Sequence, residues 1–372
     1  MTAVINESEG ILIKIPILRN FLEDVFISLG VPKNDAKIIA DVLLTADLKG
    51  ISTHGIQRLK VYYERLKKGI YNPKTRIKII KETPTTAVLD GNCGMGHVIA
   101  HRAMNIAIEK AKKHGLGAVA VRNSTHFGIA GYYSQIAIDE GMIGITTTNA
   151  TPAVPPTNGV EPLLGTNPLT AGLPTDEEFP FLLDCATSII QKGKIEMCKR
   201  EGRTLPQGLI IDEFGNSETD PNKIIDKLND KKAAILPLGS IEGNSASYKG
   251  YGYSTLVEIL SSALQDGASL KETAGIYENG KKRLKVGHFF LAINIEFFIS
   301  TSKFKQNVGK ILRKLRNAKK APNKNRIYTA GEKEYEASLD TQKMGIFVNK
   351  SIQEDLREIR DDLELYNYDS VF

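Results

Sequence analysis

The chain has 372 residues, of which 41% are hydrophobic and 25% charged, which excludes a disordered, fibrous or low-complexity protein. At roughly 150 residues per domain this length predicts two or three domains. Residues 302–326 carry ten basic and no acidic side chains, so the formal charge of +6 is local and the rest of the chain is net −4. Such a stretch can bind polyanions, but it is more often the solvated face of a helix.

The cysteines and the N-terminal segment bear on the cellular compartment. Cys93, Cys185 and Cys198 form no C-x-x-C pair, and an odd, sparse count fits a reducing compartment. The N-terminal residues are acidic where a signal peptide is basic, and no apolar run approaches the roughly 18 residues of a membrane span. We therefore expect a cytoplasmic protein that makes no membrane contact.

Hydrophobic periodicity and turn residues predict alternating helices and strands along the chain. The predicted helices are 17–30, 36–48, 56–68, 97–113, 132–139, 256–264, the basic stretch and 352–365. The predicted strands are 76–80, 86–89, 118–121, 143–147, 181–183 and 287–293. Residues 203–232 are expected to form a long excursion loop. This order predicts an α/β (α+β) fold: an all-helical domain from residues 1–74 with 302–372, and an α/β domain from 75–301.

Two glycine-rich segments raise the question of nucleotide binding. Gly115–Ala120 resembles a dinucleotide fingerprint, but it follows a helix and precedes a strand, the reverse of the required order. Gly91–Gly96 lies between a strand and a helix, where it can bind an anion at the helix N-terminus or form a plain turn. No P-loop motif is present.

Histidines, one arginine and one carboxylate are the candidate chemical groups. His97 and His101 have a chelating spacing, but nothing completes a metal motif, so we expect helix-face histidines and no metal site. His54, Arg58 and Tyr62 are each four residues apart, which puts a proton carrier, a carboxylate fork and a hydroxyl on one helix face, or else makes a capped, solvated helix.

A second candidate histidine and a carboxylate follow predicted strands. His126 comes directly after the strand at 118–121, in a loop of small residues, and Asp184 ends the run 179–184. Loops at strand ends often carry chemistry, although a structural role is comparably expected for His126. Asp184 can orient a histidine or cap the next segment.

Taken in order, several stretches resemble one known family, the malate/L-lactate dehydrogenases of the non-Rossmann type. These stretches are ADLKGISTHGIQRLKVYYERL (46–66), DGNCGMGHVIAHRAM (90–104), RNSTHFGIAGYY (122–133), GTNPLTAGLPT (165–175), LDCATS (183–188), GKIE (193–196), ILPLG (235–239), YKGYG (248–252) and GHFFLAI (287–293). The resemblance implies a non-Rossmann, NAD(P)-binding domain with a mixed, largely antiparallel sheet, and a homodimer with active sites near the subunit contact.

The resemblance also implies roles for individual residues. His126 resembles the proton acceptor, with His54 as the other candidate acid/base and Asp184 as a further catalytic residue. The implied substrate contacts are Thr53, Arg58, Tyr62, Thr166, Asn167 and Lys249. The implied cofactor contacts are Ala150, Asp184, Cys185, Ala186, Leu236, Pro237, Gly331 and Glu332.

The implied activity is interconversion of malate and oxaloacetate by hydride transfer with NAD or NADP. Alternatives are another 2-hydroxy acid (lactate, sulfolactate or ureidoglycolate) or reduction of a cyclic imino acid. The chain departs from the family at Thr53, usually serine, at Tyr248, usually histidine, and at Gln191, usually small or apolar, which affects substrate choice more than reaction type. A non-enzymatic alternative is polyanion binding by residues 303–326, but Phe304 is their one aromatic residue, so we expect no nucleic-acid partner.

Overall fold

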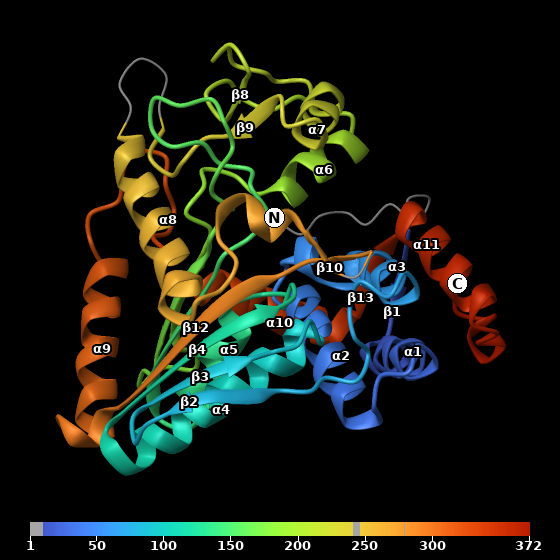
Figure 1. The fold of residues 1–372 in the computed structure, drawn as a ribbon. Coiled ribbons are helices and arrows are strands. Elements are labelled where there is room, and N and C mark those ends of the chain that lie inside the picture. The colour runs from blue at the N-terminus through green and yellow to red at the C-terminus, as the bar shows by residue number, and fades with distance from the viewer. Residues whose placement is uncertain (1–9, 241–245, 279) are drawn as a thin grey trace.

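The computed structural model describes residues 10–240, 246–278 and 280–372, and its centre is a seven-stranded sheet (Figure 1). The strands in sheet order are β2 (Lys78–Glu82), β3 (Thr86–Asp90), β4 (Leu116–Ser124), β12 (Val286–Asn294), β5 (Met142–Thr148), β6 (Leu169–Leu173) and β7 (Phe181–Cys185). β3 and β4 run parallel, and every other neighbouring pair is antiparallel. The predicted α/β class with a mixed, largely antiparallel sheet is therefore confirmed.

One face of the sheet is covered by α4 (Gly96–His114) and α5 (Gly131–Asp139). Alternate strand residues such as Val119, Val121 and Phe290 are fully buried against these helices, as the two-residue period of a strand requires. The helices approach closely because glycines lie beneath them: a Cβ on Gly117 would come within 1.9 Å of the Ala107 carbonyl oxygen. This face forms one of the hydrophobic cores.

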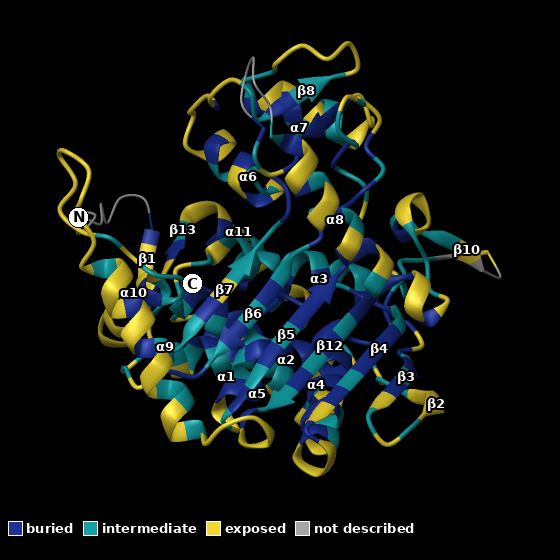
Figure 2. Cartoon of the chain, turned by 90° about the vertical axis from the view of Figure 1, so that its left-hand side faces the viewer, coloured by how far each residue is buried: buried dark blue, intermediate teal, exposed yellow. Residues whose placement is uncertain are grey.

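The opposite face, which Figure 2 views from the front, carries half-buried and exposed apolar side chains. The cross-strand register puts on this one face Leu116, Ala118, Phe289, Leu291, Ile143, Ile145, Leu169, Ala171, Phe181 and Leu183. At one end of this face, α8 (Ser247–Ser261) packs on β12, β5 and β4, and the Ser261 hydroxyl lies 3.0 Å from that of Thr147. The apolar surface beyond α8 stays partly open to solvent.

The two ends of the chain meet in a helical layer, which lies on the right of Figure 1. Its members are α1 (Ile15–Ser28), α2 (Lys33–Leu48), α3 (Leu59–Lys67), α11 (Lys350–Asp362) and the antiparallel pair β1 (Gly10–Ile13) and β13 (Ile346–Asn349). Phe21 packs edge-on against Tyr368 and Phe372, so both ends share one hydrophobic cluster. The proposed division into two domains stays a prediction.

A smaller unit with its own apolar cluster lies at the top of Figure 1. It contains α6 (Lys192–Arg200), β8 (Ile210–Asp212), α7 (Pro221–Asn229) and β9 (Ala233–Ile235). The prediction of a long loop at 203–232 was therefore wrong. The sequence does carry a helix-start signal for α7, an Asp at the N-cap followed by a Pro at the first helical position. In the structure the Asp220 side chain accepts a hydrogen bond from the Asn222 N–H, and Pro221 begins the helix.

The remaining elements complete the chain. They are the 3₁₀ helices η2 (Ser52–His54), η3 (Ile56–Arg58), η4 (Ala263–Gln265), η5 (Leu270–Ala274), η6 (Ile295–Phe297) and η7 (Tyr366–Tyr368), the pair β10 (Ile276–Glu278) and β11 (Lys281–Arg283), α9 (Thr301–Arg316) and α10 (Glu332–Met344). The basic stretch is helical only as far as Arg316, and Arg313 is paired with Asp176 and Glu177. In the described ranges no helix has the length and apolar character to cross a membrane.

Candidate active site

Two imidazole rings from distant segments lie face to face. His126 follows β4, and His54 ends the short helix η2 that follows α2. Their ring centroids are 5.8 Å apart and the planes differ by 17°. The Thr53 hydroxyl lies 3.0 Å from Nδ1 of His54. The structure therefore brings together both histidines that the sequence singled out.

Tyr62 is buried against His126. Its hydroxyl oxygen is 2.6 Å from Nδ1 of His126, and only 1% of the residue is exposed. The Gly128 N–H lies 3.3 Å from the same nitrogen. Burial raises the pKa of Tyr62, so the phenol stays neutral. The structure places this hydroxyl against the histidine, and the expected contact of Tyr62 with substrate stays a prediction.

Arg58 is held on both sides by protein groups. Its Nε donates to the Thr53 carbonyl oxygen at 2.7 Å, and Nη2 lies 3.2 Å from Oε2 of Glu196. Glu196 belongs to α6, and a Cβ on Gly193 of the same helix would lie 2.8 Å from the Thr53 Cβ. The small upper unit therefore borders the site, and Arg58 already has a carboxylate partner.

Both histidines are neutral at physiological pH. Burial, followed by the nearby Arg58 charge, lowers the pKa of His54 to about 4. Burial, followed by the neighbouring imidazoles of His54 and His97 and the Arg58 guanidinium, holds the pKa of His126 well below its usual value. A neutral imidazole next to a guanidinium is suited to accept a proton from a bound, negatively charged molecule.

Asp184 does not orient either histidine. Its Oδ2 accepts the Gly131 N–H at 2.7 Å, at the start of α5, and the Thr170 hydroxyl lies 3.4 Å from Oδ1. Burial raises the pKa of this carboxyl. Within the described residues Asp184 makes no hydrogen bond to a histidine, because the register of β7 turns its side chain toward α5. The position beside His126 is taken by Tyr62 instead.

The segments expected to contact a cofactor converge around β7 and the residues after it. The Thr187 N–H donates to the Thr166 carbonyl at 3.0 Å, and the Ile189 N–H donates to the Leu236 carbonyl at 2.8 Å. Within β7 itself, the Leu182 N–H donates to the Ala330 carbonyl oxygen at 3.2 Å. Distant parts of the sequence thus meet along β7.

A cavity of about 330 Å³ lies beside β7, where Leu182 meets Ala330. Its wall includes Lys49, Ile51, Ile129, Asp184, Tyr328 and Gly331. Ile51 and Ile129 each lie three residues from one of the two histidines, so the cavity borders the segments that carry them. Gly331 has φ of 92°, and a Cβ there would come within 2.9 Å of the Pro180 carbonyl. Lys49 and Lys333, which the sequence did not single out, contribute amino groups to this wall.

Several expected contact residues are instead engaged inside the protein. Asn167 is fully buried, donates to Glu258 Oε2 at 2.9 Å and accepts the Ala150 N–H at 3.1 Å. Glu332 is buried, and although burial opposes it, hydrogen bonds from Thr329 and Arg326 lower its pKa. These two side chains join elements and are not free for a ligand.

The other expected contacts differ in exposure. Cys185, Ala186 and Leu236 are half-buried, and Pro237 is buried. The Cys185 thiol lies 3.9 Å from the Leu169 carbonyl oxygen. Lys249 is exposed on α8, with its ammonium 5.8 Å from the centre of the Tyr248 ring, and the described residues show no contact between it and either site histidine.

The loop at Gly91–Gly96 packs against the protein. The Gly96 N–H donates to the Thr125 hydroxyl at 2.9 Å, and a Cβ on Gly96 would lie 2.1 Å from the Thr125 carbonyl oxygen. The helix N-terminus is therefore covered by the segment that leads to His126. This supports the interpretation of the loop as a plain strand–helix turn.

His97 and His101 have separate environments. His97 is fully buried and packs edge-on against Tyr62, and among the described residues neither of its ring nitrogens has a hydrogen-bond partner. Asn105 donates to the His101 carbonyl oxygen at 2.8 Å. The part of the chain that the structure describes contains no group of three or more His, Cys, Asp or Glu side chains arranged to hold a metal ion.

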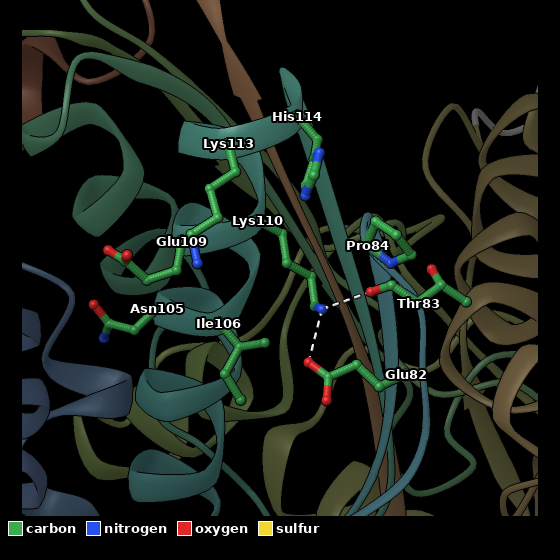
Figure 3. A pocket seen from close by; sticks show the side chains of 9 residues that line it. All are labelled: Glu82, Thr83, Pro84, Asn105, Ile106, Glu109, Lys110, Lys113 and His114. Atoms are coloured by element: carbon green, nitrogen blue, oxygen red, sulfur yellow. Dashed lines mark hydrogen bonds and ion pairs between the residues drawn. The ribbon is translucent and has the colours of Figure 1, made fainter.

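A second, more open cavity of about 530 Å³ lies between α4 and the β2–β3 connection (Figure 3). Lys110 spans it, with its ammonium 2.8 Å from both Glu82 Oε1 and the Thr83 carbonyl oxygen. None of the expected site residues lines this cavity.

Comparison with known proteins gives concordant results. A family model described as malate/L-lactate dehydrogenase matches residues 13–357. The chain is 43% identical to the malate dehydrogenase of Pyrococcus abyssi, covering 92% of both chains, and 41% identical to the L-sulfolactate dehydrogenase of Methanocaldococcus jannaschii, covering 93% of this chain and 96% of that protein. The crystal structure of malate dehydrogenase from Entamoeba histolytica matches with a TM-score of 0.92 and 44% identity, covering 96% of this chain and 99% of that one.

Proposed function

Because the chain belongs to the malate/L-lactate dehydrogenase family, we propose that it interconverts malate and oxaloacetate with NAD or NADP. The observation that carries this proposal is the neutral His54–His126 pair beside the Arg58 guanidinium. Oxidation of a hydroxyl to a ketone requires a base for the hydroxyl proton, and a substrate carboxylate requires a cation. The site offers both groups.

His126 is the base in this proposal. In the reactive tautomer of this proposal, Nδ1 carries the proton and donates it to the Tyr62 oxygen at 2.6 Å, and the longer 3.3 Å hydrogen bond from the Gly128 N–H to Nδ1 is given up. The lone pair of Nε2 is then available to take the proton of the substrate hydroxyl. In the reverse direction the protonated imidazole returns that proton to the carbonyl oxygen of oxaloacetate. His54 stacks on the ring and completes the wall of the site.

Arg58 holds a substrate carboxylate in this proposal, and Thr53 fixes Arg58. The Thr53 carbonyl oxygen binds Nε, which leaves the outer guanidinium nitrogens for an anion. Glu196 binds Nη2 in the structure described here, so the substrate carboxylate has to displace it. A planar fork that binds a carboxylate with two hydrogen bonds also orients the substrate for reaction.

The cavity beside β7 suits a nicotinamide cofactor. Its volume of about 330 Å³ lies within the range of small-molecule sites, roughly 300–1,000 Å³. Gly331 permits close approach of a ligand to the backbone, and Asp184 and Lys49 supply polar contacts between apolar walls. When bound, the cofactor supplies the hydride acceptor for the C2 hydrogen and its electron pair. We place Ala186 and Leu236 along the rest of that site.

L-Sulfolactate is the second candidate substrate. The relative named L-sulfolactate dehydrogenase is nearly as similar as the first malate dehydrogenase, at 41% against 43% identity. A sulfonate and a carboxylate are both anions, so Arg58 can bind either. The polyanion-binding alternative has less support, since Arg313, Arg316 and Arg326 are paired with acidic side chains of the same chain.

We also propose a cytoplasmic homodimer. The open apolar face of the sheet, together with the exposed side chains Tyr253, Leu256 and Ile259 of α8, is the kind of surface that a second copy covers. Cys185 and Cys198 are free thiols, as expected in a reducing compartment.

The test is reduction of oxaloacetate by the purified protein, followed by the loss of reduced-nicotinamide absorbance. NADH and NADPH are compared, and pyruvate, sulfopyruvate and a cyclic imino acid serve as alternative substrates. We expect the highest kcat/KM with oxaloacetate. Highest efficiency with sulfopyruvate selects the second candidate, and no reduction of any of these substrates contradicts the proposed function.

A further inference from the structure

Asp47 is a buried carboxylate that no step of the proposed reaction uses. It lies near the end of α2, is 7% exposed, and its Oδ2 accepts the Ile56 N–H at 2.7 Å. Burial of a carboxylate is unfavourable unless hydrogen bonds compensate for it. An apolar residue of similar size would fill this space without the cost of burying a carboxylate. The carboxylate therefore points to a specific role in holding the backbone.

Gly55 packs directly on that carboxylate. A Cβ on Gly55 would lie 2.1 Å from Oδ1, 2.2 Å from Cγ and 2.3 Å from Oδ2 of Asp47. Gly55 is the single residue between η2 and η3, so the carboxylate touches the chain where the two short helices join. No side chain fits at position 55 while Asp47 keeps its place.

The two contacts flank the reactive side chains. His54 precedes Gly55, and the Arg58 N–H donates to the Gly55 carbonyl at 2.9 Å. Fixing residues 55 and 56 therefore fixes the directions of both His54 and Arg58. Asp47 itself belongs to α2, which packs on α1, α4 and α10 and so provides a rigid support.

We propose that Asp47 is a positioning residue, which holds the 54–58 turn through Gly55 and Ile56 so that His54 and Arg58 meet the substrate in the correct geometry. This inference rests on the proposed dehydrogenase function. Asp47 is not a catalytic residue, because its contacts are with the backbone of the turn. Its removal acts through Arg58, so substrate binding and turnover change while cofactor binding does not.

The experiment is a double-mutant cycle with Asp47→Ala, Gly55→Ala and the double variant, assayed for kcat and KM with oxaloacetate and for the Kd of NADH by fluorescence. A misplacement of about 1 Å can cost roughly a hundredfold in rate, so we expect each single variant to lose at least about tenfold in kcat/KM. In the Asp47→Ala background the added methyl has space, and Gly55→Ala then costs less than about threefold more.

Two further variants separate positioning from general damage. Asp47→Asn keeps an oxygen for the Ile56 N–H and is expected to retain activity within about threefold. Asp41→Ala, on the same helix, loses contacts with Arg19 and Tyr132 and is expected to change stability without changing the KM for oxaloacetate.

The outcomes distinguish this inference from the proposed function. Fully additive losses in the cycle, unchanged kcat/KM in Asp47→Ala, or inactivity of Asp47→Asn with wild-type folding each overturn the positioning role. A wild-type protein that reduces none of the 2-oxo acids overturns the proposed function instead.

Discussion

The hydroxyl oxygen of Tyr62, a residue that is 1% exposed, lies 2.6 Å from Nδ1 of His126. In Ser-His-Asp sites a carboxylate holds the imidazole in one tautomer. Here the partner is a neutral phenol, and burial holds the pKa of the imidazole well below its usual value.

Tyr62→Phe removes this hydrogen bond and leaves the ring in place. Because a hydrogen bond to a group that becomes charged contributes about 1.5–3 kcal/mol, we expect kcat to fall roughly tenfold to a hundredfold while the Kd of NADH is unchanged. Tyr63→Phe is the matched control, since Tyr63 lies on the same helix and donates to Asp362 away from the site. Equal losses of kcat in both variants would contradict the assigned role of Tyr62.

Single alanine substitutions distinguish the roles of the two site histidines. His126→Ala removes the base, and a general acid/base contributes about 10²–10⁴-fold, so we expect a loss of kcat in that range with little change in NADH affinity. His54→Ala removes a packing partner and is expected to cost less. A loss below threefold in His126→Ala, measured under single-turnover conditions, would show that His126 is not the base.

Glu196→Gln tests whether Arg58 has to leave a protein carboxylate to bind substrate. The pair is half-exposed, and such pairs are worth up to about 1 kcal/mol, so its loss is expected to lower the KM for oxaloacetate by up to about fivefold. Glu201→Gln breaks the exposed pair with Arg203 at the end of the same helix and serves as control. A higher KM in Glu196→Gln would show that Glu196 supports substrate binding.

Buried histidines predict a loss of stability in acid. Burial lowers the pKa of both His97 and His288 to about 3, whereas an unfolded histidine titrates near 6.5. The unfolded chain therefore binds more protons below pH 6.5, and the free energy of unfolding falls by up to about 1.4 kcal/mol per pH unit for each histidine. Asp47 has the opposite effect on stability. Burial raises its pKa to about 7, so its protonated form favours the folded state as the pH falls.

The measurement is denaturant unfolding at pH 7, 6 and 5. His97→Phe removes one of the titrating groups, as well as two ring nitrogens that lack partners in the described structure, so its stability is expected to decrease less steeply toward acid. His114→Gln, at an exposed position, is the control. A slope identical to that of the wild type in His97→Phe would exclude His97 as a contributor.

The open sheet face predicts where the dimer can be broken. Leu291 lies between Ala118 and Ile145 on that face, and Leu291→Glu is expected to halve the mass measured by light scattering. Phe214→Glu changes a 79% exposed residue of the upper unit and is expected to leave the mass unchanged. A monomeric wild-type protein would contradict the homodimer.

The sequence predicted those elements whose signal is local. Helices α4 and α5 and strands β4 and β5 follow from periodicity within each segment. The pairing of β1 with β13 was not predicted, because neither four-residue segment is distinctive without its distant partner. The same reason applies to the site: His54 and Arg58 are close in sequence and were found together, whereas the contact of Glu196 with Arg58 depends on tertiary packing.

Asp47 and Tyr62 show a second limit of sequence reasoning. A carboxylate on a helix is ordinary, and only the geometry shows that it lies against Gly55. The sequence placed Tyr62 on the same helix face as Arg58 but did not predict its contact with His126, since periodicity places a side chain on a face without saying what lies between that face and solvent.

The β1–β13 pair has a consequence for biosynthesis. β13 is synthesised long after β1. Helices α1 and α2 therefore leave the ribosome long before β13 and α11 exist. Phe21 lacks its ring contacts with Tyr368 and Phe372 until most of the chain has been translated. The nascent N-terminal helices therefore expose an apolar surface until the C-terminal segment that covers it has been made.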